Sequence, residues 1–319
     1  MHEFELIKKY FSKLAKKNKS SLELNDDVFF DRSKKLVVSV DTYVEGIHFL
    51  NFKKPNLVIK KILRSSISDL ICKGVEPKYY FISGSGNKKS FSKINLSKIS
   101  RSLKEEQRKY SIFLCGGDTV FSNKLSFTIT SIGFSNKIIF RNKAKLNDDI
   151  YVTGNLGDSF IGLKLLKKKI SLNNRLNKYF INKYYLPDLQ TNISKKLLSF
   201  ANTSIDISDG LLTDLEKLIN DQKYSYKLFL KDIPISKNLK NLIDLKKYKK
   251  ISCISNGDDY QILFTANPSK SRIILKTSKL LGIKISKIGK ICPNYQKSQI
   301  IDEKNKKITL KSKGYYHKF

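Results

Sequence analysis

The sequence lacks the features that place a protein in or across a membrane. It has no run of about 18 apolar residues, the length that a membrane-spanning helix needs. The N-terminus reads Met1-His2-Glu3-Phe4-Glu5 and carries acids where a signal peptide has basic residues, and lysines interrupt the apolar stretches after it. We therefore expect a cytoplasmic protein with neither a membrane span nor a leader.

Cysteine is scarce, and tryptophan is absent. The four cysteines are spread along the chain, and none forms a Cys-x-x-Cys pair. The sequence therefore predicts neither a zinc site nor a disulfide framework. We expect reduced, mostly buried thiols at Cys72, Cys115, Cys253 and Cys292.

Acidic residues are few as well. Lys and Arg number 62 against 28 Asp and Glu, which gives a formal net charge of +34. A nucleic-acid-binding surface could account for this charge, but the lysines are scattered along the whole chain. The chain is also rich in Ile, Asn, Ser, Tyr and Phe, which indicates an AT-rich coding bias. We therefore expect no specific nucleic-acid partner, although the positive field would attract anionic substrates such as nucleotides.

The motifs of two large kinase classes are missing. The sequence has no Gly-x-x-x-x-Gly-Lys-Ser/Thr loop and no protein-kinase motif set. The loop from Gly154 to Gly157 precedes a predicted helix and could either hold an anion or form a plain turn. What is present is a globular composition, 40% hydrophobic over 319 residues, which is long enough for two domains.

Strand and helix patterns are mixed along the chain, which predicts an α/β or α+β fold. Polar, basic residues at 141–148 predict a boundary between an N-terminal domain, 1–143, and a C-terminal domain, 144–319. Two Asn- and Lys-rich stretches, 171–184 and 237–250, are expected to be variable surface. Helices are predicted at 4–17, 56–73, 96–110, between Gly157 and Lys167, at 210–220 and after Pro268. Strands are predicted at 35–41, 79–82, 112–115, 125–132, 150–153 and 261–265, with two more near Ile207 and Ile285.

The few aspartates stand at positions that favour a shared site. Asp41 ends a predicted strand, Asp118 follows two glycines after another strand, and Asp206 and Asp209 precede a glycine. Several aspartates gathered in one cleft need cations to stay ionised, and Mg²⁺ prefers carboxylate, water and phosphate oxygens. Such a cluster with a nucleotide is typical of phosphoryl transfer. A single aspartate such as Asp27 is equally well explained as a turn or helix-capping residue.

The aspartates belong to longer motifs whose order is specific. The most discriminating are Asp41-Thr42-Tyr43-Val44-Glu45-Gly46-Ile47-His48-Phe49 and the C-terminal Gly314-Tyr315-Tyr316-His317. Further motifs are Asn25-Asp26-Asp27, Ser68-Asp69-Leu70, Gly116-Gly117-Asp118, Asp206-Ile207-Ser208-Asp209-Gly210 and Gly257-Asp258-Asp259-Tyr260. From end to end, this order resembles the thiamine-monophosphate kinase family of the aminoimidazole ribonucleotide synthetase superfamily.

The resemblance implies a two-domain α/β (α+β) fold, with ATP and several Mg²⁺ ions in a cleft between the domains. It implies a homodimer in which the N-terminal domains pair their sheets. It also implies direct in-line transfer of a phosphoryl group from ATP to thiamine monophosphate, which gives thiamine diphosphate.

The resemblance also assigns roles to individual residues, with Asp209 and Arg141 as the catalytic pair. Its metal-binding positions are Asp26, Ser39, Val40, Asp41, Asp69, Asp118, Asp206 and Asp209. Its nucleotide-binding positions are Tyr110, Gly117, Asp118, Arg141 and Ser208, and its substrate-binding positions are His48, Asp258 and Phe319.

Some of these residues also fit purely structural roles. His48 could be a structural histidine, Tyr110 a core residue and Arg141 a solvated surface charge. Val40 stands where the family has Thr, so a metal contact there would have to use the backbone, and Asp258 stands where it has Glu.

Two other functions fit parts of the sequence. One is another ATP-using enzyme of the same superfamily, which the His48 motif and the C-terminal motif argue against. The other is a basic nucleic-acid-binding protein with a decayed metal site, which the retained strand-end aspartates argue against.

Overall fold

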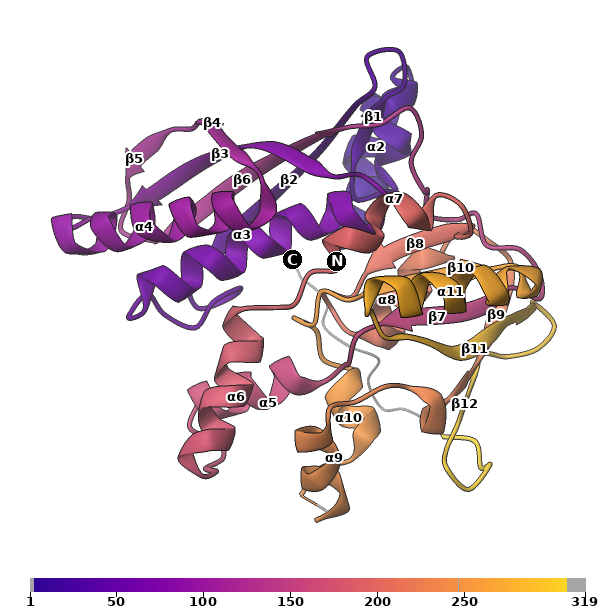
Figure 1. The fold of residues 1–319 in the computed structure, drawn as a ribbon. Helices are drawn as coiled ribbons and strands as arrows, with labels where there is room; N and C mark the ends of the chain where they lie inside the picture. The colour runs from indigo at the N-terminus through magenta and orange to yellow at the C-terminus, as the bar shows by residue number, and fades with distance from the viewer. Residues whose placement is uncertain (1–2, 246, 309–319) are drawn as a thin grey trace.

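The computed structural model describes residues 3–245 and 247–308 and contains two mixed β-sheets of six strands each (Figure 1). The first sheet has the order β1-β2-β6-β3-β4, with β5 paired to β3, and the second has the order β12-β9-β11-β7-β10-β8. The predicted mixed α/β class is confirmed. The first sheet comprises β1 (Phe29–Asp31), β2 (Leu36–Val44), β3 (Pro77–Gly86), β4 (Phe113–Gly116), β5 (Thr119–Phe121) and β6 (Ser126–Phe134). The second comprises β7 (Asp149–Thr153), β8 (Thr203–Asp206), β9 (Tyr224–Phe229), β10 (Ile262–Ala266), β11 (Ile285–Pro293) and β12 (Gln299–Ile301).

The helices accompany these sheets. The long helices α3 and α4 lie along one side of the first sheet (Figure 1). The helix predicted at 4–17 is divided, because a π-helical segment, Ile7–Phe11, separates α1 from α2. The helices are α1 (Glu3–Leu6), α2 (Ser12–Ala15), α3 (Pro55–Cys72), α4 (Lys93–Tyr110), α5 (Asp158–Leu166), α6 (Asn174–Tyr185), α7 (Ser194–Leu197), α8 (Leu211–Leu218), α9 (Lys237–Asp244), α10 (Lys250–Ile254) and α11 (Ser271–Leu281).

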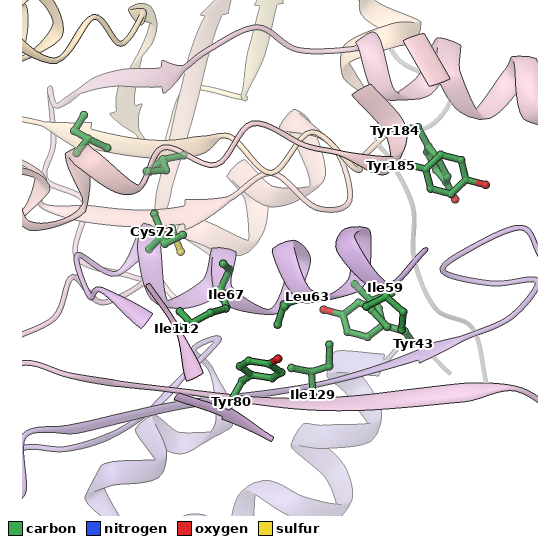
Figure 2. Close-up of a cluster of buried hydrophobic side chains, with 14 of the residues drawn as sticks. Tyr43, Ile59, Leu63, Ile67, Cys72, Tyr80, Ile112, Ile129, Tyr184 and Tyr185 are labelled. Carbon is green, nitrogen blue, oxygen red and sulfur yellow. The ribbon is translucent and has the colours of Figure 1, made fainter. Parts of the chain in front are cut away.

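Helix α3 is the central packing element. It begins with a proline at its first turn, where the missing N–H is not needed. Its side chains Ile59, Leu63 and Ile67 are fully buried and point at the first sheet (Figure 2). Tyr184 and Tyr185 of α6 belong to the same hydrophobic cluster and lie on the other side of α3 (Figure 2). Because α3 is packed on both sides, its polar residues are held at the junction of the two halves of the chain.

Two stretches expected to be variable surface contribute to the core instead. Residues 171–184 overlap α6, which buries Phe180, and residues 237–250 overlap α9, which buries Leu239 and Leu242. That prediction was wrong because the apolar residues recur at helical spacing among the lysines and asparagines. Most of the exposed positions of each helix are polar, which is typical of an amphipathic helix.

The cysteines are free thiols, but only two of them are buried. Cys72 and Cys253 lie in the interior, Cys292 is half-buried, and Cys115 is exposed, so the expectation of mostly buried thiols was only partly right. No helix in the described part of the chain combines the length and the apolar character that a membrane crossing requires.

Candidate active site

One cavity of about 390 Å³ is lined by residues from both halves of the chain. Strand β2 and the turn after it, together with α3, form one wall. The segment after β8, helix α5 and the loop 256–260 form the other. The predicted site residues that line it are Asp41, His48, Asp69, Asp206, Ser208, Asp209 and Asp258.

Serine hydroxyls orient two of the cavity carboxylates. Ser39 on β2 donates to Asp69 Oδ2 on α3 at 2.5 Å. Ser68 on α3 donates to Asp206 Oδ2 at the end of β8 at 2.7 Å. The second bond joins the two halves of the chain, so α3 fixes the position of a carboxylate from each half.

Close backbone packing holds the two C-terminal motif loops together. A Cβ atom at Gly257 would lie 1.6 Å from the carbonyl oxygen of Ser208, so only glycine fits there. The N–H of Asp258 donates to that same carbonyl at 2.9 Å, and the N–H of Tyr260 donates to the carbonyl of Ile207 at 2.8 Å. This pairing places Asp258 next to the segment that carries Ser208 and Asp209.

Three of the cavity carboxylates, Asp41, Asp69 and Asp206, have a raised pKa. Burial raises the pKa of Asp41 to about 6, and the Asp27 charge adds to the shift. Burial and the Asp27 charge raise the pKa of Asp206 to about 7. Burial, followed by the charges of Asp41 and Asp206, raises the pKa of Asp69 well above its ordinary value. The cluster therefore gathers more negative charge than the surrounding protein neutralises.

This environment fits divalent cations. Among the described residues, the buried Oδ2 atom of Asp41 has no hydrogen-bond partner. In the same part of the chain, no group of three or more His, Cys, Asp or Glu side chains is gathered closely enough to cage an ion by itself. An ion held here would therefore complete its shell with water or phosphate oxygens, as Mg²⁺ commonly does.

Next to the cluster lies a segment that we call the acid turn, Asn25-Asp26-Asp27. The Lys73 ammonium, fully buried, lies 2.7 Å from Asp26 Oδ1 and 2.9 Å from Asp27 Oδ2. It also donates to the carbonyl of Ser204 at 2.9 Å. Burial opposes the charged form of Lys73, but the charges of Asp26 and Asp27 outweigh burial and raise its pKa. The Lys73 ammonium therefore offsets negative charge at the acid turn.

Arg141 also contacts the acid turn. Its Nη1 donates to Asp27 Oδ1 at 3.1 Å, its Nη2 to Asn25 Oδ1 at 2.8 Å and its backbone N–H to Asp26 Oδ2 at 2.9 Å. Arg141 is 5% exposed, so it is not a solvated surface charge. Neither Arg141 nor Asp26 lines the cavity.

Residues 25–135 match the family described as AIR synthase related protein, N-terminal domain. The thiamine-monophosphate kinase of Buchnera aphidicola subsp. Acyrthosiphon pisum (strain APS) is 36% identical over 325 residues, which cover 99% of this chain and 98% of that protein. The chain belongs to the thiamine-monophosphate kinase family. The thiamine-monophosphate kinase of Haemophilus influenzae is 32% identical, covering 99% of this chain and 98% of its own. The solved structure of AaThiL complexed with AMPPCP and TMP has a TM-score of 0.84 at 25% identity, covering 99% of this chain and 97% of that chain.

Besides Arg141, three positions that the resemblance to thiamine-monophosphate kinases assigns to the nucleotide lie apart from the cavity. Gly117 and Asp118 are exposed between β4 and β5. A Cβ atom at Gly117 would lie 1.8 Å from the carbonyl oxygen of Ile82, so the close approach to β3 requires glycine. Asp118 Oδ1 accepts from the N–H of Thr119 at 2.7 Å. Tyr110, half-buried at the end of α4, has the Arg64 guanidinium 5.6 Å from its ring centroid.

The remaining positions assigned to metal and substrate are placed as follows. His48 lines the cavity, its Nδ1 accepts from the N–H of Val44 at 3.0 Å, and its ring stands edge-on to that of Tyr43. The Val40 side chain is exposed and is absent from the cavity lining, so a metal contact from this position would use the backbone. Phe319 lies outside the described residues.

Several residues at or beside the cavity were given no role from the sequence. Tyr43 and Tyr260 line the cavity and stand within motifs of the family resemblance, but neither was assigned a function, and Phe160 lines it outside any motif. Lys61 contacts the cavity residue Asp258 from a buried position. In a chain with 62 basic residues, nothing in the sequence separates this lysine from the others.

Proposed function

We propose that this protein phosphorylates thiamine monophosphate with ATP and releases thiamine diphosphate and ADP. The observation that carries the proposal is the full-length likeness to AaThiL, whose structure contains AMPPCP, an ATP analogue, together with TMP. Full-length identities of 36% and 32% to thiamine-monophosphate kinases support it. The carboxylate-lined cavity has the chemistry that phosphoryl transfer needs.

The transfer itself is in line. An oxygen of the substrate's phosphate attacks the γ-phosphorus of ATP, the bond from that phosphorus to the bridging oxygen breaks, and ADP leaves. The attacking oxygen already carries negative charge, so no side chain has to remove a proton. The main obstacle is repulsion between two phosphate groups. The cavity residues would hold the two groups in line in a preorganised site, and Mg²⁺ held by the carboxylates would screen the repulsion.

Asp41, Asp69, Asp206 and Asp209 are the residues that would hold Mg²⁺. The raised pKa values of Asp41 and Asp206 support this, since burial leaves both carboxylates short of compensating positive charge. Bound there, the ions would supply positive charge between the reacting phosphates. Asp27, whose charge acts on the same cluster, is a further candidate ligand.

Arg141 and Asp26 act on the reaction through the acid turn. Both are engaged with neighbouring protein groups rather than with the cavity. Their contacts fix the orientation of Asp27 relative to the cavity cluster. Their removal would displace that carboxylate.

A homodimer would form through the side of the first sheet that faces away from α3. Val40 on β2 and Phe81 on β3 are both in register with Thr130 on β6, so the three side chains form one row on this side. Further exposed apolar side chains on this side of the sheet are Phe113, Val120 and Phe134, as their register with β2 and β3 indicates. An exposed apolar face of this extent is typical of a protein–protein interface. Since β4 leads from it to Gly117 and Asp118, the assigned nucleotide positions lie beside the pairing face.

The deciding experiment is a coupled ADP-release assay with ATP and Mg²⁺, with thiamine monophosphate as acceptor and thiamine as control. Turnover that requires the monophosphate and ignores thiamine is the expected result. ATP binding without turnover on thiamine monophosphate would instead indicate another reaction of the superfamily. Steep, salt-dependent duplex binding with no ATP turnover would support the nucleic-acid alternative.

A further inference from the structure

A buried lysine, Lys61, does not line the cavity but contacts Asp258, which does. Lys61 is in the middle of α3, and its side chain is 2% exposed, whereas the adjacent Lys60 points outward and pairs with Glu105 at the surface. An ammonium group is costly to bury unless charge and hydrogen bonds compensate it. Burial lowers the pKa of Lys61, and the Asp258 carboxylate opposes that shift. A residue so placed needs a structural or functional reason.

The surroundings of Lys61 explain how its charge is tolerated. Its Nζ forms an ion pair with Asp258 Oδ1 and lies 4.1 Å from the centroid of the Tyr184 ring. The carbonyl of Tyr184 accepts from it at 3.5 Å. Lys61 belongs to the half of the chain with the first sheet, and both partners belong to the other half. The lysine therefore joins the two halves at the base of the cavity.

Asp258 is held in one orientation by three contacts. Its backbone is left-handed, with φ of 68°, and its N–H is bonded to the carbonyl of Ser208. The hydroxyl of Tyr260 donates to Oδ1 at 3.2 Å, the same oxygen that Lys61 contacts. Within the described residues, no donor reaches Oδ2. Since Asp258 lines the cavity, Oδ2 is the oxygen left for a ligand.

The ion pair between Lys61 and Asp258 also determines which chemical group of a ligand the Asp258 carboxylate binds selectively. With the ammonium in contact, the pair carries no net charge, so it attracts a cationic ring only weakly. It remains a strong acceptor for an N–H donor. The only N–H donor of thiamine monophosphate is the exocyclic amino group of its pyrimidine ring. A fixed acceptor left unpaired disfavours an analogue without that donor.

We propose that Lys61 is a positioning residue that fixes Asp258 so that Oδ2 accepts a hydrogen bond from the pyrimidine amino group of thiamine monophosphate. The inference rests on the proposed function, because it names how that substrate is selected. Lys61 itself does not touch the substrate.

The test is calorimetric binding of thiamine monophosphate and of the analogue in which hydrogen replaces the amino group. Lys61→Met should weaken binding of the monophosphate by at least about tenfold and bring the two affinities close together. Lys60→Met, the neighbouring surface lysine, should change neither affinity. In the double variant Lys61→Met/Asp258→Asn, the loss should not exceed that of the more affected single variant.

Each other outcome has a distinct meaning. A Lys61→Met protein that keeps the wild-type preference for the amino group would overturn the inference and leave the proposed function intact. Wild-type protein that binds no thiamine monophosphate would overturn the proposed function and, with it, this inference. Should Lys61→Met fail to fold, Tyr260→Phe removes the other contact to Oδ1. Tyr260→Phe should also reduce the preference for thiamine monophosphate over the analogue without the amino group. An unchanged preference would count against the inference.

Discussion

Among single residues, Asp209 is the cavity carboxylate with a direct lysine partner on α8. It pairs with Lys217, whose Nζ also lies 3.4 Å from Asp214 Oδ1. Burial opposes the charged form of Lys217, but the charges of Asp214 and Asp209 outweigh burial and raise its pKa. Asp209 thus joins a fixed charge network on one side to the open cavity on the other, a suitable position for a charge that acts on phosphates.

We predict that Asp209→Asn lowers turnover by about 100-fold, because the substitution removes a preorganised charge and keeps the side chain's size. Steady-state ADP release at saturating ATP would measure it. Asp244→Asn, an equivalent change at an exposed position at the end of α9, should leave turnover unchanged. Near-normal turnover of the Asp209 variant would remove this residue from the catalytic role.

At the same scale, sequence reasoning identified much of the cavity but not its supporting cations. Asp41, Asp69 and Asp206 could be predicted because acids are rare in this chain and stand in family motifs. Lys61 and Lys73 could not, because lysine is abundant and burial is set by packing between distant segments. The carboxylates thus carried sequence information, and their lysine partners became evident only from three-dimensional contacts.

At the scale of elements, the side of the first sheet that faces away from α3 is the surface proposed for dimer formation. One side is covered by α3 and α4 (Figure 1). The other exposes the row of Val40, Thr130 and Phe81. We predict that Phe81→Glu weakens dimer formation by at least about 100-fold, because it places a charge in the centre of an apolar contact. Sedimentation velocity over a concentration series would measure the change.

The matched control for this prediction lies on the other half of the molecule. Leu280 on α11 is 72% exposed, so Leu280→Glu adds the same charge away from the first sheet. It should leave the association unchanged. A wild-type protein that stays monomeric at all concentrations would contradict the homodimer itself.

The helices and strands also show where apolar spacing in the sequence predicts an element and where it does not. The helix predicted at 56–73 was confirmed as α3, which combines apolar spacing with a clear start and stop. The strand predicted at 35–41 exists as β2, but its predicted end was wrong: β2 continues to Val44, so Asp41 lies within the strand. The core helix α6 was missed because its lysines and asparagines suggested variable surface. The edge strand β12 is three residues long, too short to carry a period.

At the scale of the whole molecule, buried carboxylates link folding stability to pH. Burial raises the pKa of Asp41 to about 6, of Asp206 to about 7, and of Asp214 and Asp259 to about 8. Aspartates in an unfolded chain titrate at about pH 4. Between about pH 4 and pH 8 the folded protein therefore binds more protons than the unfolded chain, so its stability falls as the pH rises.

We predict that the metal-free protein unfolds at a temperature about 5 °C lower at pH 8 than at pH 5. Asp27 does not alter the trend, because its pKa is held below the ordinary value and it stays ionised throughout this range. Scanning calorimetry would measure the shift, and Mg²⁺ should raise the unfolding temperature more at pH 8 than at pH 5. A metal-free protein that becomes more stable toward pH 8 would contradict this pH dependence.

The buried contact between Lys73 and the acid turn bears on how the molecule responds when magnesium is withdrawn. The Lys73 ammonium and the Arg141 guanidinium belong to the chain and cannot dissociate, so a chelator that strips every divalent ion leaves Asp26 and Asp27 paired with positive charge. Among the described residues, no lysine or arginine pairs in this way with Asp41, Asp69 or Asp206. In a chelating buffer the acid turn should keep its shape while the carboxylates beside it repel one another, so we expect the molecule to loosen first around Asp41, Asp69 and Asp206.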